Sequence, residues 1–518
     1  MKSIMTHTTV MSGAKAAVLG LALISLVNCS SSDDTTPQVT RGGSAALQGP
    51  MVFVNNTGDS SLTSVSLKGD SGNAVLGTIP AAKFEGVALS DMQFSTGNWF
   101  FVNLTAANKV ATIDPLTGAT PVHEVNLPAG TRPVHLYRDR NNGEVIWIMN
   151  DGDRASGTST PGDDLVNCAA QGGGSVTALH NSHLGPGATP PRVLGTTCLL
   201  ADGHKVAAFS DVPKRVFVSS GNAGEIAVID DDEASANYRK MINRIDLCKS
   251  AKETAPCNDE SATPLTTAFT PNRSAPHGIR WSNLTKKIYS VQEGYGEIAE
   301  IDPATLAITK TFDLTGTPYT GHGISPDGRF LLLRGATTAP TATQATKLGV
   351  IDLILTTPVR TDFTIAELDG TSPGAFKFSP DGKRFYILAG NTATSTKKDR
   401  LFAFDSSTLT ATTPALTLLR EIPLVVTGGH GFDVLAQGAG EAKYIVVSNS
   451  TDNSVSIINA SDNQEKQKVT VGPTPGSVIV YFSGAATGGK QATASLTGAS
   501  KAQTSVLPDQ LDNHGMPE

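Results

Sequence analysis

The chain has 518 residues, a net charge of −7, 39% hydrophobic residues and 17% charged residues. This composition supplies a large apolar core and excludes an intrinsically disordered protein. Gly and Pro are frequent, with 51 and 29 copies, but they follow no fixed period, which excludes a collagen-like fibre and predicts many turns. No basic cluster stands out, so the sequence gives no electrostatic support for a nucleic-acid partner or an anionic membrane surface.

The N-terminal segment predicts export. Lys2 and Lys15 precede an apolar run that ends at Val27 and is short for a membrane span. The sequence Leu26-Val27-Asn28-Cys29 resembles the lipobox of bacterial lipoproteins, in which a diacylglyceryl group is attached to the Cys and the chain is cut before it. Asn28 departs from the usual Gly, Ala or Ser. Secretion without lipidation is the alternative, since it uses the same signal.

We therefore expect residues 1–28 to be a signal peptide and residues 29–49 to be a lipidated Cys29 with a polar tether. The protein would lie in the cell envelope, either in the periplasm or at the outer membrane or cell surface, and would meet the membrane only through its lipid. Residues 483–518 are rich in Gly, Ala, Ser and Thr and predict a flexible tail.

Four cysteines remain if Cys29 is acylated, an even number for an oxidising compartment. The local solution pairs Cys168 with Cys198 and Cys248 with Cys257. The chain contains no Cys-x-x-Cys-His sequence, which excludes a c-type haem, and no Cys-x-x-Cys sequence that would suggest structural zinc.

One short pattern recurs eight times between residues 50 and 482. It consists of an alternating strand, a polar turn, a second strand of the Arg-Phe-Tyr-Ile type, a third strand ending in Asp or Asn, and a fourth strand. Four short strands per unit predict an all-β fold, a β-propeller of eight four-stranded blades, or seven if one unit is misread. Residues 476–482 supply a first strand to the unit that begins at Met51, so the two ends of the chain share one blade. The second strands lie at 51–54, 99–102, 145–148, 215–218, 287–290, 330–333, 384–387 and 444–447.

Several of these units resemble YVTN-type propeller repeats. The similarity is carried by residues 277–314, by the two Ser-Pro-Asp-Gly turns at 325–328 and 379–382, and most closely by residues 444–471. It implies a propeller over about residues 50–482. A His near the start of a blade belongs to that repeat pattern.

Aligning the first strands places one residue of each blade at an equivalent turn, where a propeller opens on one face. One interpretation is architectural, with each imidazole bonded to a backbone carbonyl. The other is a ring of ligands for a transition metal such as Cu or Fe, or for a non-covalent haem, with Glu85 completing the set. Neighbouring blades favour His204, His277 and His322, joined by His135, as ligands. The aligned residues are Glu85, His135, His204, His277, His322, Gly374, His430 and Gly476.

Two propeller families give the second interpretation a precedent. The copper-cluster domain of nitrous oxide reductase and the haem domain of cytochrome-type nitrite reductase are similar to this sequence in blade architecture and ring position only. Turns after the second strands, including Asp151 and Glu293, open on the same face and favour either turn geometry or contact with a polar ligand.

The function predicted first is a non-catalytic one, in which the propeller is a binding or scaffold module for an envelope protein or a small ligand. A metal- or haem-binding oxidoreductase that uses the histidine ring is the second hypothesis. A lactonase-like hydrolase, by analogy with other propellers, is the third. The fold alone does not choose among them, and no catalytic residue is predicted.

Overall fold

The protein is described here from a computed structural model, and every described residue belongs to the unit formed by residues 41–518. The described residues are 50–94, 100–113, 121–142, 145–152, 174–180, 191–199, 203–258, 270–317, 319–336, 345–391, 399–410, 414–424, 431–437 and 440–482. The predicted signal peptide, lipobox, tether and tail, together with Cys168 and His430, lie outside these residues.

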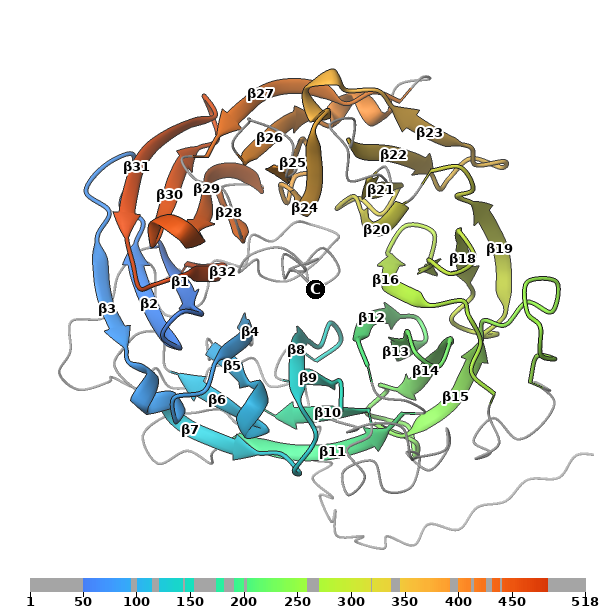
Figure 1. Cartoon of the computed structure of the whole chain (residues 1–518). Helices are drawn as coiled ribbons and strands as arrows, with labels where there is room; N and C mark the ends of the chain where they lie inside the picture. The colour runs from blue at the N-terminus through green and yellow to red at the C-terminus, as the bar shows by residue number, and fades with distance from the viewer. Residues whose placement is uncertain are drawn as a thin grey trace, which may run out of the picture. The chain divides into compact units, whose positions relative to one another are not determined.

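Eight antiparallel sheets of four strands each form the blades of a ring (Figure 1). Blade 1 contains β32 (Pro475–Phe482), β1 (Pro50–Asn56), β2 (Ser61–Ser66) and β3 (Val75–Ile79). Blade 2 contains β4 (Leu89–Phe94), β5 (Phe100–Leu104), β6 (Lys109–Ile113) and β7 (Pro121–Asn126). Blade 3 contains β8 (Pro133–Arg138), β9 (Val145–Asn150), β10 (Ser175–His180) and β11 (Arg192–Cys198). Blade 4 contains β12 (Lys205–Asp211), β13 (Lys214–Ser220), β14 (Glu225–Asp230) and β15 (Met241–Asp246).

The second half of the ring repeats this order. Blade 5 contains β16 (Pro276–Ser282), β17 (Lys287–Gln292), β18 (Glu297–Ile301) and β19 (Ile308–Asp313). Blade 6 contains β20 (Tyr319–Ile324), β21 (Phe330–Ala336), β22 (Thr346–Asp352) and β23 (Arg360–Phe363). Blade 7 contains β24 (Thr371–Phe378), β25 (Arg384–Asn391), β26 (Arg400–Asp405) and β27 (Thr417–Pro423). Blade 8 contains β28 (Phe432–Gln437), β29 (Glu441–Asn449), β30 (Ser454–Asn459) and β31 (Gln464–Thr470).

Short 3₁₀ turns are the only helical elements among the described residues. They are η1 (Ala81–Phe84), η2 (Thr105–Ala107), η3 (Ala366–Leu368), η4 (Ser407–Thr410) and η5 (Ser450–Asp452). In that part of the chain no helix has both the length and the apolar character needed to cross a membrane.

The ring closes as predicted. Strand β1 pairs with β2 on one side and with β32, the last strand, on the other. The fold class is therefore confirmed as an eight-bladed all-β propeller in which the two ends share one blade, and the seven-bladed alternative is excluded. Closure gives β1 a partner on both sides, and the separate blades keep only short edges.

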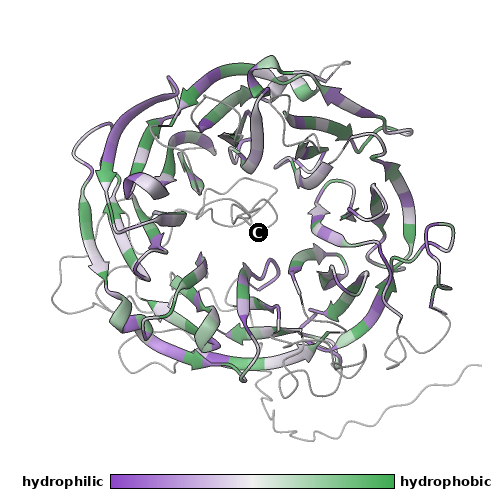
Figure 2. Cartoon of the chain, viewed as in Figure 1, coloured by the Kyte–Doolittle hydropathy of each residue, from purple (hydrophilic) through white to green (hydrophobic). Residues whose placement is uncertain are grey.

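The core lies between the blades. Second strands such as β9 are buried along their whole length because neighbouring blades cover both of their faces, and they therefore read as continuous apolar runs. One buried cluster joins Trp147 of blade 3, Phe217 of blade 4 and Trp281 of blade 5. Outer strands such as β19 alternate between partly buried or buried residues and exposed ones. Apolar residues, drawn in green, recur along the strands of each blade (Figure 2).

The two faces of the ring can be told apart by strand direction. Because four antiparallel strands follow one another in each blade, every inner strand begins on one face, the entry face, and ends on the other, the exit face. Thr57 N donates to Thr474 O (2.9 Å), which places the β1–β2 turn beside the start of β32 on the entry face. Strand β1 therefore begins, at Pro50, on the exit face.

A disulfide joins Cys248 to Cys257 beyond the end of β15, as predicted. Cys198, the last residue of β11, is also disulfide-bonded. Its predicted partner, Cys168, lies outside the described residues.

Two buried aspartates lie between blades 3 and 4 on the exit face. Trp147 Nε1 donates to Asp139 Oδ2 and Asn141 Nδ2 donates to Asp231 Oδ2, each at 2.8 Å. Both carboxyl groups are almost fully buried. Desolvation, followed by repulsion from Asp139, raises the pKa of Asp231 to about 8.

We expect this pair to make the protein less stable at pH 8 than at pH 5. Because the folded pKa of Asp231 exceeds the unfolded value of about 3.9, the folded chain keeps a proton that the unfolded chain loses between about pH 4 and pH 8. The free energy of unfolding then falls across this window by up to ~1.4 kcal/mol per pH unit. Asp231→Asn, which stays neutral, should remove most of this slope in urea titrations at the two pH values.

The matched control is Asp232→Asn, which alters an exposed carboxyl group in the same loop. It should keep the wild-type pH dependence. An unchanged slope in Asp231→Asn would show that the buried pair does not hold the proton.

Candidate functional site

Three of the predicted histidines meet on the entry face. His135 lies in β8, His204 directly precedes β12, and His277 lies in β16, so they come from three consecutive blades. The ring centroids of His135 and His204 are 4.8 Å apart and their planes are almost perpendicular, at 87°. The centroids of His204 and His277 are 5.5 Å apart. We call these residues the histidine triplet.

Each ring of the histidine triplet has a carboxylate oxygen facing its Nδ1 atom. The distances are 3.6 Å from His135 to Asp91, 3.9 Å from His204 to Asp151, and 2.9 Å from His277 to Glu293. Only the contact of His277 with Glu293 is within hydrogen-bonding distance. There the carboxylate orients the imidazole and favours the tautomer whose Nε2 accepts a ligand. His277 Nδ1 also lies 3.3 Å from the Thr320 carbonyl oxygen.

Asp91 also joins two blades. Its Oδ1 atom accepts a hydrogen bond from Met92 N (2.8 Å) within β4. Its Oδ2 atom, which faces His135, accepts one from Leu136 N (2.9 Å) in β8 of the next blade. The carboxylate beside His135 is therefore held in place from both blades.

Asp151 lies just after β9 and is mostly buried. Burial raises the pKa of this carboxyl group, and the positive charge of nearby Lys205 opposes the rise. Lys205 Nζ donates to the Gly203 carbonyl oxygen (2.5 Å). The site therefore contains a carboxyl group and a cation as well as the three rings.

The inner strands reach this face through β-bulges. Six of the eight inner strands shift register near their start, which re-aims the side chains there. The shifts lie at Val54/Asn56, Leu89/Met92, Pro133/His135, Pro276/Ile279, Tyr319/Gly321 and Pro373/Phe376.

In blade 2, Asp91 occupies the position that His135 holds in blade 3. Asp91 precedes Met92, which pairs with Val102, just as His135 precedes Leu136, which pairs with Ile148. The alignment of first strands placed Glu85 at this position, but the inner strand begins only at Leu89, after Glu85. The alternating segment Leu89 to Phe94, directly before the second strand, is the signal that would have identified Asp91.

Glu85 lies outside the histidine triplet. It caps η1 in the left-handed conformation, with φ of 55°, and its carboxylate pairs with Lys109 at the start of β6. Lys109 also contacts Glu124 at 3.2 Å. The structure therefore places Glu85 in a surface ion-pair group and does not bring it to the predicted ring.

His322 does not join the histidine triplet either. Its side chain is fully buried, and its Nε2 atom lies 3.2 Å from the carbonyl oxygen of Tyr289 in the neighbouring blade. It pairs with Leu333, two residues beyond the unpaired Thr320, whereas Gly321 holds the place directly after the bulge that His135 holds in blade 3. His322 therefore fits the architectural interpretation, in which an imidazole is bonded to a backbone carbonyl.

The glycines of the aligned set are also structural. The Gly374 carbonyl oxygen accepts a hydrogen bond from Arg334 Nη1 (2.9 Å), and that of Gly476 accepts one from Ser448 Oγ (2.5 Å). His430 lies outside the described residues. Within the described ranges no three His, Cys, Asp or Glu side chains are arranged so that they could hold a metal ion.

No family model matches the chain, and no curated protein matches its sequence. The YVTN label therefore rests on the repeat pattern alone. The fold is similar to that of AztD from Citrobacter koseri, with a TM-score of 0.50 and 13% identity, covering 84% of this chain and 98% of that one. It is also similar to the periplasmic gluconolactonase PpgL from Pseudomonas aeruginosa, with a TM-score of 0.48 and 14% identity, covering 84% and 99%. Identities this low show the propeller fold alone.

Proposed function

We propose that this protein is a cell-envelope binding module whose ligand is a divalent transition-metal ion, bound by His135, His204 and His277. The observation that carries the proposal is the histidine triplet itself: three imidazoles from consecutive blades, in ring contact, each with a carboxylate oxygen within 3.9 Å of Nδ1 and one of them, His277, hydrogen-bonded to it. Imidazole suits Zn, Cu, Fe and Ni. Ligating histidines usually bond their second nitrogen to a carboxylate or carbonyl group.

Three imidazoles are the kind of ligand that such an ion prefers. In the present side-chain conformations they do not converge on one point. Since no three described ligand side chains could hold a metal ion as they stand, binding requires the imidazoles to rotate or a further ligand to join them. The proposal keeps the non-catalytic binding module predicted from the sequence and names its ligand class.

Equilibrium dialysis tests this proposal. The purified chain is first stripped with a chelator and then dialysed separately against Zn²⁺, Cu²⁺ and Ca²⁺. We expect one equivalent of Zn²⁺ or Cu²⁺ per chain and no retained Ca²⁺, because Ca²⁺ prefers oxygen ligands. A chain that retains none of these ions, or retains Ca²⁺ equally well, would overturn the proposal.

We also propose that the protein is held to the envelope by a lipid on Cys29. The supporting observations are the apolar run and the lipobox-like sequence that ends at this residue. Acylation would be the only membrane attachment that the sequence suggests.

We expect Cys29→Ser to move the protein from the membrane fraction to the soluble envelope fraction, since the lipid has no other attachment residue at the lipobox. Fractionation followed by immunoblotting measures this shift. Thr35→Ser, in the predicted tether, is the control and should stay in the membrane fraction. A wild-type protein that is soluble and begins at another residue would show that the anchor proposal is wrong.

A lactonase-like hydrolase is the second candidate. The observation that favours it is the 2.9 Å contact between His277 Nδ1 and Glu293, because an imidazole oriented by a carboxylate can act as a general base. A pH-stat assay with glucono-δ-lactone tests it, with the His277→Ala variant in parallel. A wild-type rate equal to that in buffer would eliminate this candidate and leave the metal-binding module.

A further inference from the structure

The most exposed large apolar side chains lie together on one face of the ring. Among the described residues, five exceed the rest in exposure: Val212 (70%), Val359 (66%), Ile354 (51%), Leu284 (50%) and Leu355 (49%). The other four exposed examples, with 39–42% exposure, lie in outer strands: Val75 and Leu76 in β3, Val193 in β11 and Leu419 in β27.

All five lie in turns of the exit face on three consecutive blades. Val212 lies between β12 and β13 of blade 4, and Leu284 lies between β16 and β17 of blade 5. Ile354, Leu355 and Val359 lie between β22 and β23 of blade 6. We call these five residues the apolar turn row. An exposed cluster of this kind marks a surface that meets another apolar phase.

Polar contacts connect the turns that carry the apolar turn row. Lys286 Nζ contacts Asp211 Oδ2 (2.8 Å), which joins the turns of blades 5 and 4. Ser282 Oγ donates to the Gly328 carbonyl oxygen (2.5 Å), which joins blades 5 and 6. Leu353 N donates to the Arg329 carbonyl oxygen (2.9 Å) within blade 6. These contacts join the turns that carry the apolar turn row across blades 4 to 6.

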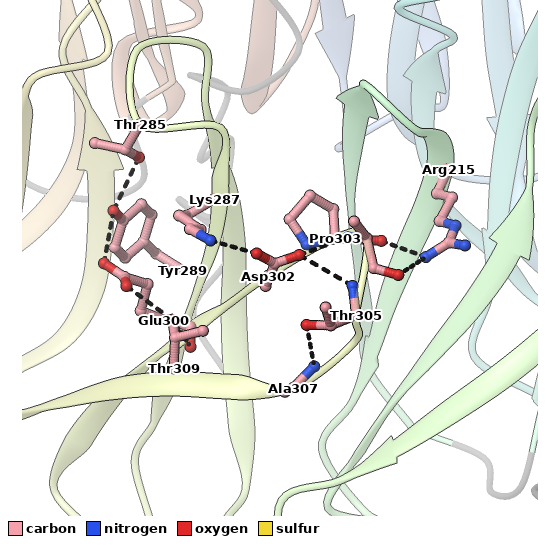
Figure 3. A network of polar contacts seen from close by, with 11 residues as sticks. Arg215, Thr285, Lys287, Tyr289, Glu300, Asp302, Pro303, Thr305, Ala307 and Thr309 are labelled. Atoms are coloured by element: carbon pink, nitrogen blue, oxygen red, sulfur yellow. Dashed lines mark hydrogen bonds and ion pairs between the residues drawn. The ribbon is translucent and has the colours of Figure 1, made fainter. Parts of the chain in front are cut away.

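The turn that carries Leu284 also rests on a rigid polar network (Figure 3). The hydroxyl groups of Thr285 and Tyr289 are 2.9 Å apart, and Tyr289 donates to Glu300 at 3.1 Å. Lys287 Nζ contacts Asp302 Oδ2 at 2.5 Å beside this row of hydrogen bonds. These contacts hold the residues that follow Leu284, so the position of this exposed side chain is restricted.

Two ion pairs lie in the turns of the apolar turn row, and exposed charges lie close by: Lys214 follows Val212 by two residues, and the neighbouring β14–β15 loop carries Asp232 and Glu233. Lys286 contacts Asp211, as described, and Arg329 contacts Asp352 at 2.7 Å. A paired charge loses less on leaving bulk water than an isolated one. The two paired groups therefore oppose an approach to an apolar interface less than isolated charges would.

The chain enters the propeller on this same face. Strand β1 begins at Pro50 on the exit face, where the Pro50 carbonyl oxygen accepts a hydrogen bond from Leu67 N (2.8 Å). The segment from Cys29 to Pro50 is about 21 residues and extends at most ~70 Å. A tether of this length lets a lipid on Cys29 reach a membrane that lies against the exit face, an orientation in which the histidine triplet, on the entry face, faces solvent.

We propose that the exit face lies on the membrane surface, with the apolar turn row inserted at the boundary between headgroups and acyl chains. This inference rests on the lipid anchor of the proposed function and not on metal binding. The anchor supplies attachment, and the apolar side chains supply a second contact that fixes orientation. The occupant of the apolar turn row is therefore a lipid surface.

Quenching of a fluorescent label tests the orientation. The lipidated full-length chain, carrying Val359→Cys or Ala106→Cys with a polarity-sensitive dye, is reconstituted into phosphatidylcholine vesicles that contain acyl-chain spin labels. Val359 marks the exit face, and Ala106, an exposed residue of η2, marks the entry face. We expect at least a two-fold loss of fluorescence at Val359→Cys and none at Ala106→Cys.

A matched pair of four-fold variants tests the role of the apolar side chains. Val212→Ser, Leu284→Ser, Ile354→Ser and Leu355→Ser together should abolish quenching at Val359→Cys. Val75→Ser, Leu76→Ser, Val193→Ser and Leu419→Ser together should leave it unchanged, although the same number of exposed apolar side chains is removed.

Equal quenching on both faces, no quenching at Val359→Cys, or a chain that does not enter the vesicles would overturn the orientation. The comparison of the two labels needs neither four-fold variant, so it holds even where a variant fails to fold. Metal content is measured on the same samples by elemental analysis, so the failure of the metal-binding function is seen separately from a failure of the orientation.

Discussion

The variant that combines His135→Ala with His204→Ala is expected to bind Zn²⁺ on the order of 100-fold more weakly than the wild type, or not at all. Loss of a second-shell partner alone costs about 10–100-fold in metal affinity, and this variant removes two proposed ligands. The two rings are in edge-to-face contact, with centroids 4.8 Å apart. Competition with a chromophoric chelator measures the change in affinity.

His123→Ala is the matched control. His123 lies in the outer strand β7, where its carbonyl oxygen accepts a hydrogen bond from Thr112 Oγ1 (3.2 Å), so its side chain is away from the inner strands. It should bind Zn²⁺ as the wild type does. If the double variant keeps wild-type affinity, the histidine triplet is architectural and the metal proposal fails.

Lys377→Met is expected to lower the free energy of unfolding by about 3–5 kcal/mol, because it leaves a buried carboxylate without its cation. Lys377 Nζ lies 3.0 Å from Asp433 Oδ1, and the two side chains are 0% and 1% exposed. Asp433 also accepts hydrogen bonds from Val434 N (2.9 Å) and from Val480 N (2.8 Å) in the closing strand β32. This one carboxylate therefore ties blades 7, 8 and 1 together.

Guanidinium chloride titrations measure this loss. The control is Lys383→Met, since Lys383 is 66% exposed and lies 3.8 Å from Asp381, and exposed pairs contribute about 0–1 kcal/mol. Adding Asp433→Asn to Lys377→Met should recover part of the stability, because the remaining charge is then removed. A change below about 1 kcal/mol in Lys377→Met would show that the pair does not hold the ring closed.

The blades were predictable because their second strands are covered on both faces and therefore read as apolar runs. The predicted segment 215–218 falls inside β13, and 287–290 falls inside β17. That the two ends share one blade could be predicted because the first strand at 476–482 is followed by no second strand in the sequence. Local composition and turn chemistry carry this information without knowledge of long-range pairing.

The candidate site was only partly predictable. His135, His204 and His277 lie near the start of their inner strands, and the repeat pattern brought them together correctly. His322 and Glu85 were placed by the same pattern, but strand register decides their positions, and register depends on bulges that the sequence does not mark. The carboxylates of Asp151 and Glu293 come from turns after second strands, and only the folded ring shows which histidine each one faces.

An X-ray absorption spectrum of the Zn²⁺-loaded protein tests the central claim most directly. If the histidine triplet binds the ion, the spectrum will show nitrogen ligands at about 2.0–2.1 Å with the outer-shell scattering of at least two imidazole rings, and this scattering will disappear in the His135→Ala, His204→Ala variant. A shell made only of oxygen or sulfur, or imidazole scattering that persists in that variant, would contradict it.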